Sequence, residues 1–167
     1  YAEQIANYHK NNDNLKVSVI DQESIFNEFS SGAPDVAAIR NFVKMFYDRS
    51  TNESDMIKYL LLFGDGSFDN KLSSESNTNK ILTYQSENSL SPTQSFVTDD
   101  FFGLLDDNEG EASGLVDIGI GRLPVNTSEE AQIVTSKITN YNNNTKGDWQ
   151  TAICIIGDDE DNNTHMR

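Results

Sequence analysis

Carboxylate side chains gather between residues 99 and 117, and they are the clearest chemical signal in the chain. Oxygen ligands clustered on a loop are what calcium ions use in proteins, where about six to eight oxygen atoms surround the ion. The spacing does not follow the EF-hand pattern, so a calcium site and a solvated acidic loop both remain open. The residues predicted as calcium ligands are Asp99, Asp100, Asp106, Asp107, Glu109 and Asp117.

Apolar segments that end in charged residues or glycine are a second signal. In open parallel sheets, ligands bind beyond the carboxyl ends of the strands. Carboxylates gathered there could hold a cation or a basic substrate group, or could simply be solvated, and Arg122 is expected to pair with one of them. The segments are Leu15–Ile20 before Asp21, Ile57–Phe63 before the turn Gly64–Gly66, Val116–Gly121 before Arg122, and Ala152–Gly157 before Asp158 and Asp159.

The turn GDGSFDNK, residues 64–71, matches neither glycine-rich phosphate loop and lacks the nucleophile-elbow pattern. Asp65 also places negative charge where a phosphate would sit, so we exclude a nucleotide loop. A phosphotransfer domain with Asp65 as acceptor is an alternative, but the strand-end lysine and early acidic pair that it needs are not evident. Gly64 and Gly66 permit a tight turn in which Asp65 accepts backbone N–H groups, which favours a structural role.

Cysteine chemistry has little support in these residues. Cys154 is the only cysteine, and its place in the apolar run AICIIG predicts a buried, unreactive thiol. The only histidines are His9, in the N-terminal segment, and His165, beyond the last apolar run. A Cys154–His165 dyad and a zinc site are therefore not expected.

The elements that must position these groups alternate between strands and helices. Helices are predicted over residues 35–50, starting at Asp35, over 128–141 with Ser128 as the cap, and over 1–9; a short strand is predicted at 81–85. Strand–helix–strand order implies right-handed crossovers and a mainly parallel sheet, so the fold class is an α/β sandwich. The polar insertion at residues 67–111 is of a length that is usually functional or mobile.

Composition limits the possible partners. The chain has 167 residues, enough for one domain, and its 12 Lys+Arg against 27 Asp+Glu give a net charge of −15. Such a charge disfavours nucleic acid and anionic lipid and favours cations or basic peptides. No apolar run is long enough for membrane insertion, and a single cysteine excludes an internal disulfide. Because the chain begins at Tyr1 without Met, we expect a processed piece of a longer protein.

Several motifs, in the same order along the chain, resemble the gingipain-type cysteine peptidases. They are YLLLFGDGSFDNK, TYQSENS, SFVTDDFFGLLDDNEG, VDIGIGRLPVNTSEEAQIVTSKITNY and AICIIGDDEDNNTHM. The most specific part is DIGIGR-P followed by a helix ending in tyrosine and an apolar strand ending in acid. Within the family, the resemblance is greatest to the cell-surface sortases of the type IX secretion system of Bacteroidetes.

The resemblance implies a caspase-like peptidase domain, a three-layer α/β/α sandwich of two subdomains lying side by side. It makes residues 1–167 the N-terminal subdomain, whose partner is the catalytic subdomain of the same polypeptide. The His–Cys dyad of the family lies in that second subdomain, and neither His165 nor Cys154 matches its positions, so no catalytic residue is expected here. The implied enzyme is secreted or held at the outer-membrane surface and cleaves the C-terminal signals of secreted cargo.

The resemblance also gives a role to the acidic turn after the last apolar run. In gingipains, carboxylates in the matching segment border the substrate cleft, and one can receive a basic side chain. The substrate-binding candidates are therefore Asp158, Asp159, Glu160 and Asp161. Without the resemblance, a non-enzymatic calcium- or peptide-binding α/β module explains the acid clusters equally well.

Overall fold

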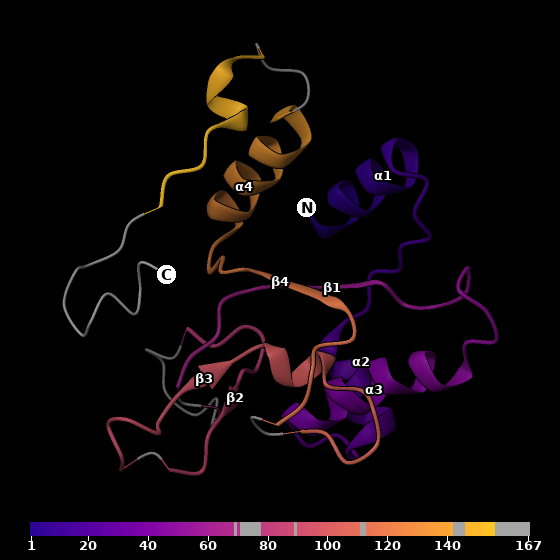
Figure 1. The fold of residues 1–167 in the computed structure, drawn as a ribbon, viewed down its shortest axis with the longest axis vertical. Helices are drawn as coiled ribbons and strands as arrows, with labels where there is room; N and C mark the ends of the chain where they lie inside the picture. The colour runs from indigo at the N-terminus through magenta and orange to yellow at the C-terminus, as the bar shows by residue number, and fades with distance from the viewer. Residues whose placement is uncertain (69, 71–77, 89, 111–112, 142–145, 156–167) are drawn as a thin grey trace.

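The computed structural model describes residues 1–68, 70, 78–88, 90–110, 113–141 and 146–155 (Figure 1). Its helices are α1 (Ala2–Asn12), α2 (Gln22–Phe29), α3 (Val36–Arg49) and α4 (Ser128–Tyr141), and its 3₁₀ turns are η1 (Asp100–Gly103) and η2 (Asp148–Thr151). Its strands are β1 (Tyr59–Phe63), β2 (Tyr84–Gln85), β3 (Val97–Thr98) and β4 (Gly119–Leu123). Among the described residues, no helix is both long and apolar enough to cross a lipid bilayer.

The parallel pair of β1 and β4 is the centre of the fold, and it confirms the predicted α/β class with parallel pairing. The two strands lie in register along their whole length. The pairing continues beyond them, because the Gly64 amide donates to the Leu123 carbonyl and the Asp65 amide donates to the Val125 carbonyl. Both carboxyl ends therefore reach the same edge of the sheet, where the turn after β1 lies beside the residues that lead into α4.

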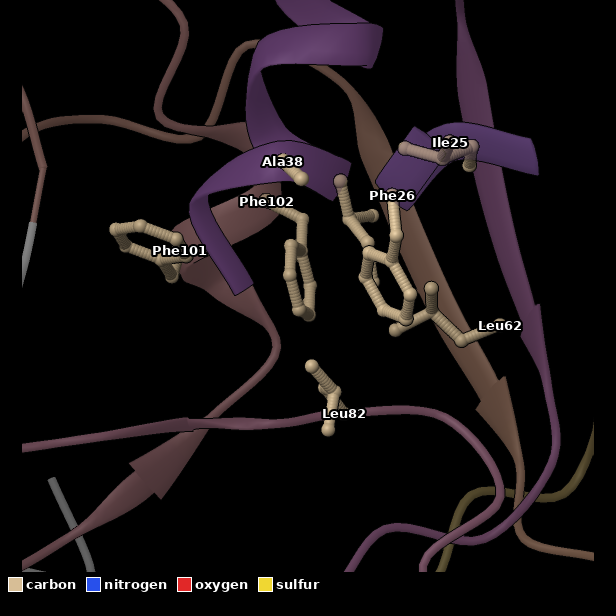
Figure 2. Close-up of a cluster of buried hydrophobic side chains, with 8 residues drawn as sticks. Ile25, Phe26, Ala38, Leu62, Leu82, Phe101 and Phe102 are labelled. Carbon is tan, nitrogen blue, oxygen red and sulfur yellow. The ribbon is translucent and has the colours of Figure 1, made fainter. Parts of the chain in front are cut away.

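An apolar core joins one face of this sheet to α2 and α3. Leu62 of β1 belongs to the same buried cluster as Phe26 of α2, Ala38 of α3 and Phe102 of η1 (Figure 2). Leu82, from the insertion between β1 and β4, completes this side of the cluster. Full burial of an aliphatic or aromatic side chain contributes about 1.5–3 kcal/mol. This packing anchors η1, and with it the start of the acidic loop, against the helices.

The other helices, α1 and α4, lie on the opposite side of the two strands from α2 and α3 (Figure 1). Helix α1 buries Ile5 and Ala6, and α4 buries Ala131 and Thr135. Leu60 and Leu62 of β1 pack on the α2–α3 side, so Tyr59 and Leu61 point to the side of α1 and α4, where they remain 66% and 45% exposed. The layer order of the predicted α/β/α arrangement is therefore present, with this second face covered only in part.

The helix starts follow capping rules, with one difference from the prediction. Asp35 caps α3 as predicted, because its side chain accepts the Ala37 amide at 2.8 Å. The cap of α4 is Thr127 and not Ser128, so that prediction is wrong by one residue. The Thr127 hydroxyl accepts the Glu130 amide at 3.1 Å, and the Glu130 carboxylate accepts the Thr127 amide at 3.2 Å. This reciprocal pair is a capping box, which satisfies two amides at once.

Two predicted strands are not strands in the structure. Residues 15–20 and 152–155 have no ladder of hydrogen bonds within the described part of the chain, and a strand needs a paired neighbour to be stable. Helix α2 was not predicted, because Asp21 was interpreted as a strand-end acid. Asp21 instead caps α2 by accepting the Glu23 amide. The short strand expected at 81–85 is reduced to β2, which pairs antiparallel with β3.

Candidate functional site

The turn after β1 is held in place by Asp65. One carboxylate oxygen accepts the Gly66 amide at 3.0 Å, as the sequence predicted, and the other accepts the Asn126 side-chain amide at 2.8 Å. The Asp65 carbonyl also accepts the amides of Lys80 and Ile81. Both oxygens of this carboxylate are thus engaged with the protein itself, which disfavours a role as phosphoryl acceptor.

The two glycines of this turn lie close to neighbouring groups. A Cβ atom on Gly64 would lie 2.8 Å from the Ile81 side chain and 2.9 Å from Lys80 Cβ. A Cβ atom on Gly66 would lie 3.3 Å from Arg122 Nη1. The insertion and the arginine therefore pack directly onto the backbone of the turn: a side chain at Gly64 would force its neighbours to shift, and one at Gly66 would be tight.

Arg122, at the end of β4, makes five hydrogen bonds at this edge. Its Nε and Nη2 atoms form a bidentate ion pair with Asp99, both at 2.7 Å. Nη1 donates to the carbonyls of Gly64 at 2.9 Å and Ile81 at 3.0 Å, and Nη2 donates to the carbonyl of Leu82 at 3.0 Å. A guanidinium has five N–H groups, so this one has none left for a substrate. The side chains of Arg122 and Asp99 are only 13% and 23% exposed.

Of the acids expected at the strand ends, the two that the structure describes, Asp21 and Asp65, are not the partners of Arg122. We expected Arg122 to pair with one of them, and its partner is Asp99, from the acidic loop region. Asp65 bonds to its own turn and Asp21 caps a helix. The predicted substrate-binding residues lie outside the described residues; they are Asp158, Asp159, Glu160 and Asp161.

The acidic loop brings together three of its six predicted calcium ligands. Carboxylate oxygens of Asp106, Glu109 and Asp117 all lie within 4.8 Å of one another. The other three lie apart from this cluster. Asp99 pairs with Arg122, Asp107 forms an ion pair with Lys44 at 3.3 Å, and Asp100 is an exposed residue of η1.

Hydrogen bonds already engage the three clustered carboxylates. The Tyr47 hydroxyl donates to Asp106 at 2.9 Å, and the Leu105 amide donates to Asp117 at 2.8 Å. Glu109 accepts the amides of Asp106 at 3.3 Å and Leu115 at 3.0 Å. Carboxylate oxygens have more than one lone pair, so these bonds leave room for a cation.

One face of α3 holds the acidic loop, and the sequence analysis missed it. Arg40 donates to the carbonyls of Leu104 and Glu109, and Lys44 donates to the carbonyl of Leu105. Tyr47 adds its bond to Asp106. Arg40, Lys44 and Tyr47 are four and three residues apart, the spacing that puts side chains on one helix face. Basic and hydroxyl groups at that spacing in an acidic chain could have predicted that this helix face contacts the acidic loop.

The pKa values of two side chains on this face of α3 are raised. The hydrogen bond to Asp106, together with burial and the charges of Asp117 and Asp106, raises the pKa of Tyr47 to about 12. Burial acts to lower the pKa of Lys44, but its hydrogen bonds and charge interactions with Asp48 and Asp107 outweigh burial and raise it. Near neutral pH, Tyr47 therefore stays a hydrogen-bond donor and Lys44 stays charged.

No cysteine–histidine pair is found among the described residues. Cys154 is exposed, so the prediction of a buried thiol is wrong; the segment around it has no neighbouring strand to cover it in the described part of the chain. His9, in α1, forms a hydrogen bond through Nδ1 to a carboxylate oxygen of Asp13, the C-terminal cap of the same helix, at 2.6 Å. His165 lies outside the described residues.

The family model for peptidase family C25 matches residues 1–167, the whole chain. The chain belongs to peptidase family C25. A solved structure, the crystal structure of dimeric latent PorU from Porphyromonas gingivalis, matches the fold with a TM-score of 0.71 at 40% sequence identity. No curated protein matches the chain. The predicted membership of the gingipain family, C25, and the predicted similarity to PorU are thereby confirmed.

The match to PorU covers only a small part of that protein, so the activity of the whole PorU chain is not assigned to this chain by the match. The PorU match covers 84% of this chain but only 14% of the PorU chain. This C25 chain is therefore peptidase-related and corresponds to part of a larger PorU-like polypeptide.

Proposed function

We propose that residues 1–167 are the N-terminal, non-catalytic subdomain of a cysteine peptidase that serves as a sortase of the type IX secretion system. The complete enzyme would cleave the C-terminal signals of secreted cargo. The observation that carries this proposal is the carboxyl edge of the sheet, where Arg122 and Asp65 direct their polar atoms to the protein itself. Side chains engaged in this way would support a neighbouring site and are not themselves free to act as nucleophiles.

Exposed apolar side chains support a second subdomain as the partner. Tyr59 and Leu61 of β1 are 66% and 45% exposed, and Ile153 and Ile155 are 88% and 84% exposed. Large apolar side chains exposed to this extent are typical of surfaces covered by another protein segment. We assign that position to the catalytic subdomain of the same polypeptide, in an enzyme that is secreted or held at the bacterial outer-membrane surface.

Substrate contacts are the next part of the proposal. The substrates would be proteins or peptides, and the net charge of −15 favours basic groups on them while disfavouring nucleic acid. The family resemblance supports Asp158–Asp161 as the turn that borders the cleft. A basic side chain at the cleavage point would relieve the mutual repulsion of these four acids.

The experiment compares residues 1–167 alone with the complete protein on a peptide that carries a C-terminal secretion signal. We expect turnover only by the complete protein, and we expect Cys154→Ala in the complete protein to leave that turnover unchanged. Turnover by the isolated chain that disappears on Cys154→Ala would overturn the non-catalytic assignment. Absence of cleavage by the complete protein would overturn the sortase assignment.

Calcium binding is the second candidate function, in the same subdomain or in a non-enzymatic module. The convergence of Asp106, Glu109 and Asp117 favours it. Three carboxylates supply the hard oxygen ligands of such a site, and water or backbone carbonyls would have to supply the rest. Asp99 and Asp107 pair with cationic side chains and Asp100 lies outside the cluster, so we reduce the proposed side-chain ligands to the three carboxylates.

A further inference from the structure

Arg122 binds both strands of the β2–β3 pair at the base of the pair. Ile81 and Leu82, whose carbonyls it binds, lie just before β2, and Asp99 directly follows β3. The same guanidinium binds Gly64, in the turn after β1. One side chain therefore fastens both strands of the pair to the carboxyl edge of the β1–β4 sheet.

Other described contacts also hold the base of the β2–β3 pair, because the Asp65 carbonyl accepts the amides of Lys80 and Ile81 and Leu82 is buried in the apolar core. Each strand has only two residues, and an isolated two-stranded ribbon is marginal in water. Tyr84 stacks on Phe101 with 4.5 Å between ring centroids, and this is a contact at the base of the pair. Farther out, Leu90 and Val97 are exposed. The orientation of the pair thus depends on bonds at its base, and Arg122 makes most of those bonds to the sheet.

We propose that Arg122 is a positioning residue, which fixes the β2–β3 pair as one wall of the substrate cleft. The inference rests on the proposed peptidase function, because ligands of parallel sheets bind beyond the carboxyl ends of the strands. Asp99 is the counter-ion that orients the guanidinium, and Thr83 donates a further bond to Asp99 at 3.3 Å. Neither Arg122 nor Asp99 touches the reacting atoms.

Arg122→Lys is the informative variant. It keeps the positive charge opposite Asp99 but replaces a planar fork by a single ammonium group, which cannot bind four separated groups in the same geometry. In the complete protein, we expect this variant to raise the KM for a peptide carrying a C-terminal signal by about tenfold, about 1.4 kcal/mol, with kcat little changed. Hydrogen exchange should quicken in residues 80–86 and 94–99 while α3 keeps its protection.

Ile5→Val is the control for loss of stability. Ile5 is buried in α1, on the other side of the sheet from the β2–β3 pair. This variant should lower the Tm without changing KM or the exchange of the β2–β3 pair. If Arg122→Lys quickens exchange evenly over the whole chain, or shifts KM no more than Ile5→Val does, Arg122 is only a stabilising residue. A wild-type protein without peptidase activity would refute the proposed function, and the exchange pattern alone would then decide whether Arg122 positions the pair.

Discussion

Asp106→Asn tests the calcium site, because it removes one charge and keeps the shape of the side chain. Carboxylate oxygens of Asp106 lie within 4.8 Å of those of Glu109 and Asp117. At that distance, two unit charges repel by about 1 kcal/mol in a water-like dielectric, and salt reduces this further. Removing the charge therefore relieves about 1–2 kcal/mol of repulsion, but it also weakens the bond from Tyr47 by about 1 kcal/mol. In EDTA, the two effects nearly cancel.

Calcium changes this balance. A ligand at a hundred times its Kd stabilises the folded state by about 2.7 kcal/mol. For a chain of this size, each kcal/mol corresponds to about 2–4 °C in Tm. The wild-type protein should therefore gain about 5–10 °C when calcium replaces EDTA, and Asp106→Asn should lose most of that gain. The assay is thermal unfolding followed by circular dichroism at fixed ionic strength.

Asp100→Asn is the matched control, since Asp100 is exposed and lies outside the cluster of Asp106, Glu109 and Asp117. It should leave the calcium-dependent gain intact. Equal Tm values of the wild-type protein in calcium and in EDTA would refute the site. The cluster would then be held only by Tyr47 and the backbone amides.

Three further predictions test the fold around the site. Phe102→Ala should destabilise the chain by about 3–5 kcal/mol in urea unfolding, because Phe102 is fully buried; a loss below 1 kcal/mol would show that the core collapses around it. Thr127→Ala should cost about 1 kcal/mol in the same assay by removing the cap of α4, whereas Ser128→Ala should cost much less. The folded-state pKa of Tyr47, about 12, lies above its ordinary value of 10.0, so the contribution of Tyr47 to folding stability is present below pH 10 and is lost as the pH rises toward 12. Tyr47→Phe should therefore flatten the fall of the unfolding free energy between pH 10 and pH 12. An unchanged slope would contradict the raised pKa.

The sequence predicted those elements whose signal is local. The apolar run at residues 57–63 contains β1, and the amphipathic repeat after Asp35 is α3, because its period and its cap agree. Segment 15–20 has a strand-like composition, but a strand also depends on a partner, which composition does not reveal. Asp21 was misinterpreted because its role, too, depends on packing that composition does not reveal. A helix cap and a strand-end acid have the same residue type, and only the packing of Ile25 and Phe26 distinguishes them.

The site was predictable only in part, because its contacts join distant parts of the chain. The turn after β1 could be predicted, since glycine and aspartate adjacent in sequence define its geometry. The pairing of Arg122 with Asp99 could not, because it depends on how the insertion folds back over the sheet edge. For the same reason, the sequence suggested six calcium ligands where the structure brings three together.

Five acids of the loop at residues 99–117 fall into two groups with different physical roles. Asp99 and Asp107 each have a cationic partner, Arg122 and Lys44 respectively, so their charges are compensated within the protein. Asp106, Glu109 and Asp117 have no basic side chain within ion-pair distance in the part of the chain that the structure describes. Three close carboxylates without a counter-ion repel one another, and a bound cation would remove that cost. The compensated acids therefore brace the fold, while the uncompensated cluster is where added calcium should act.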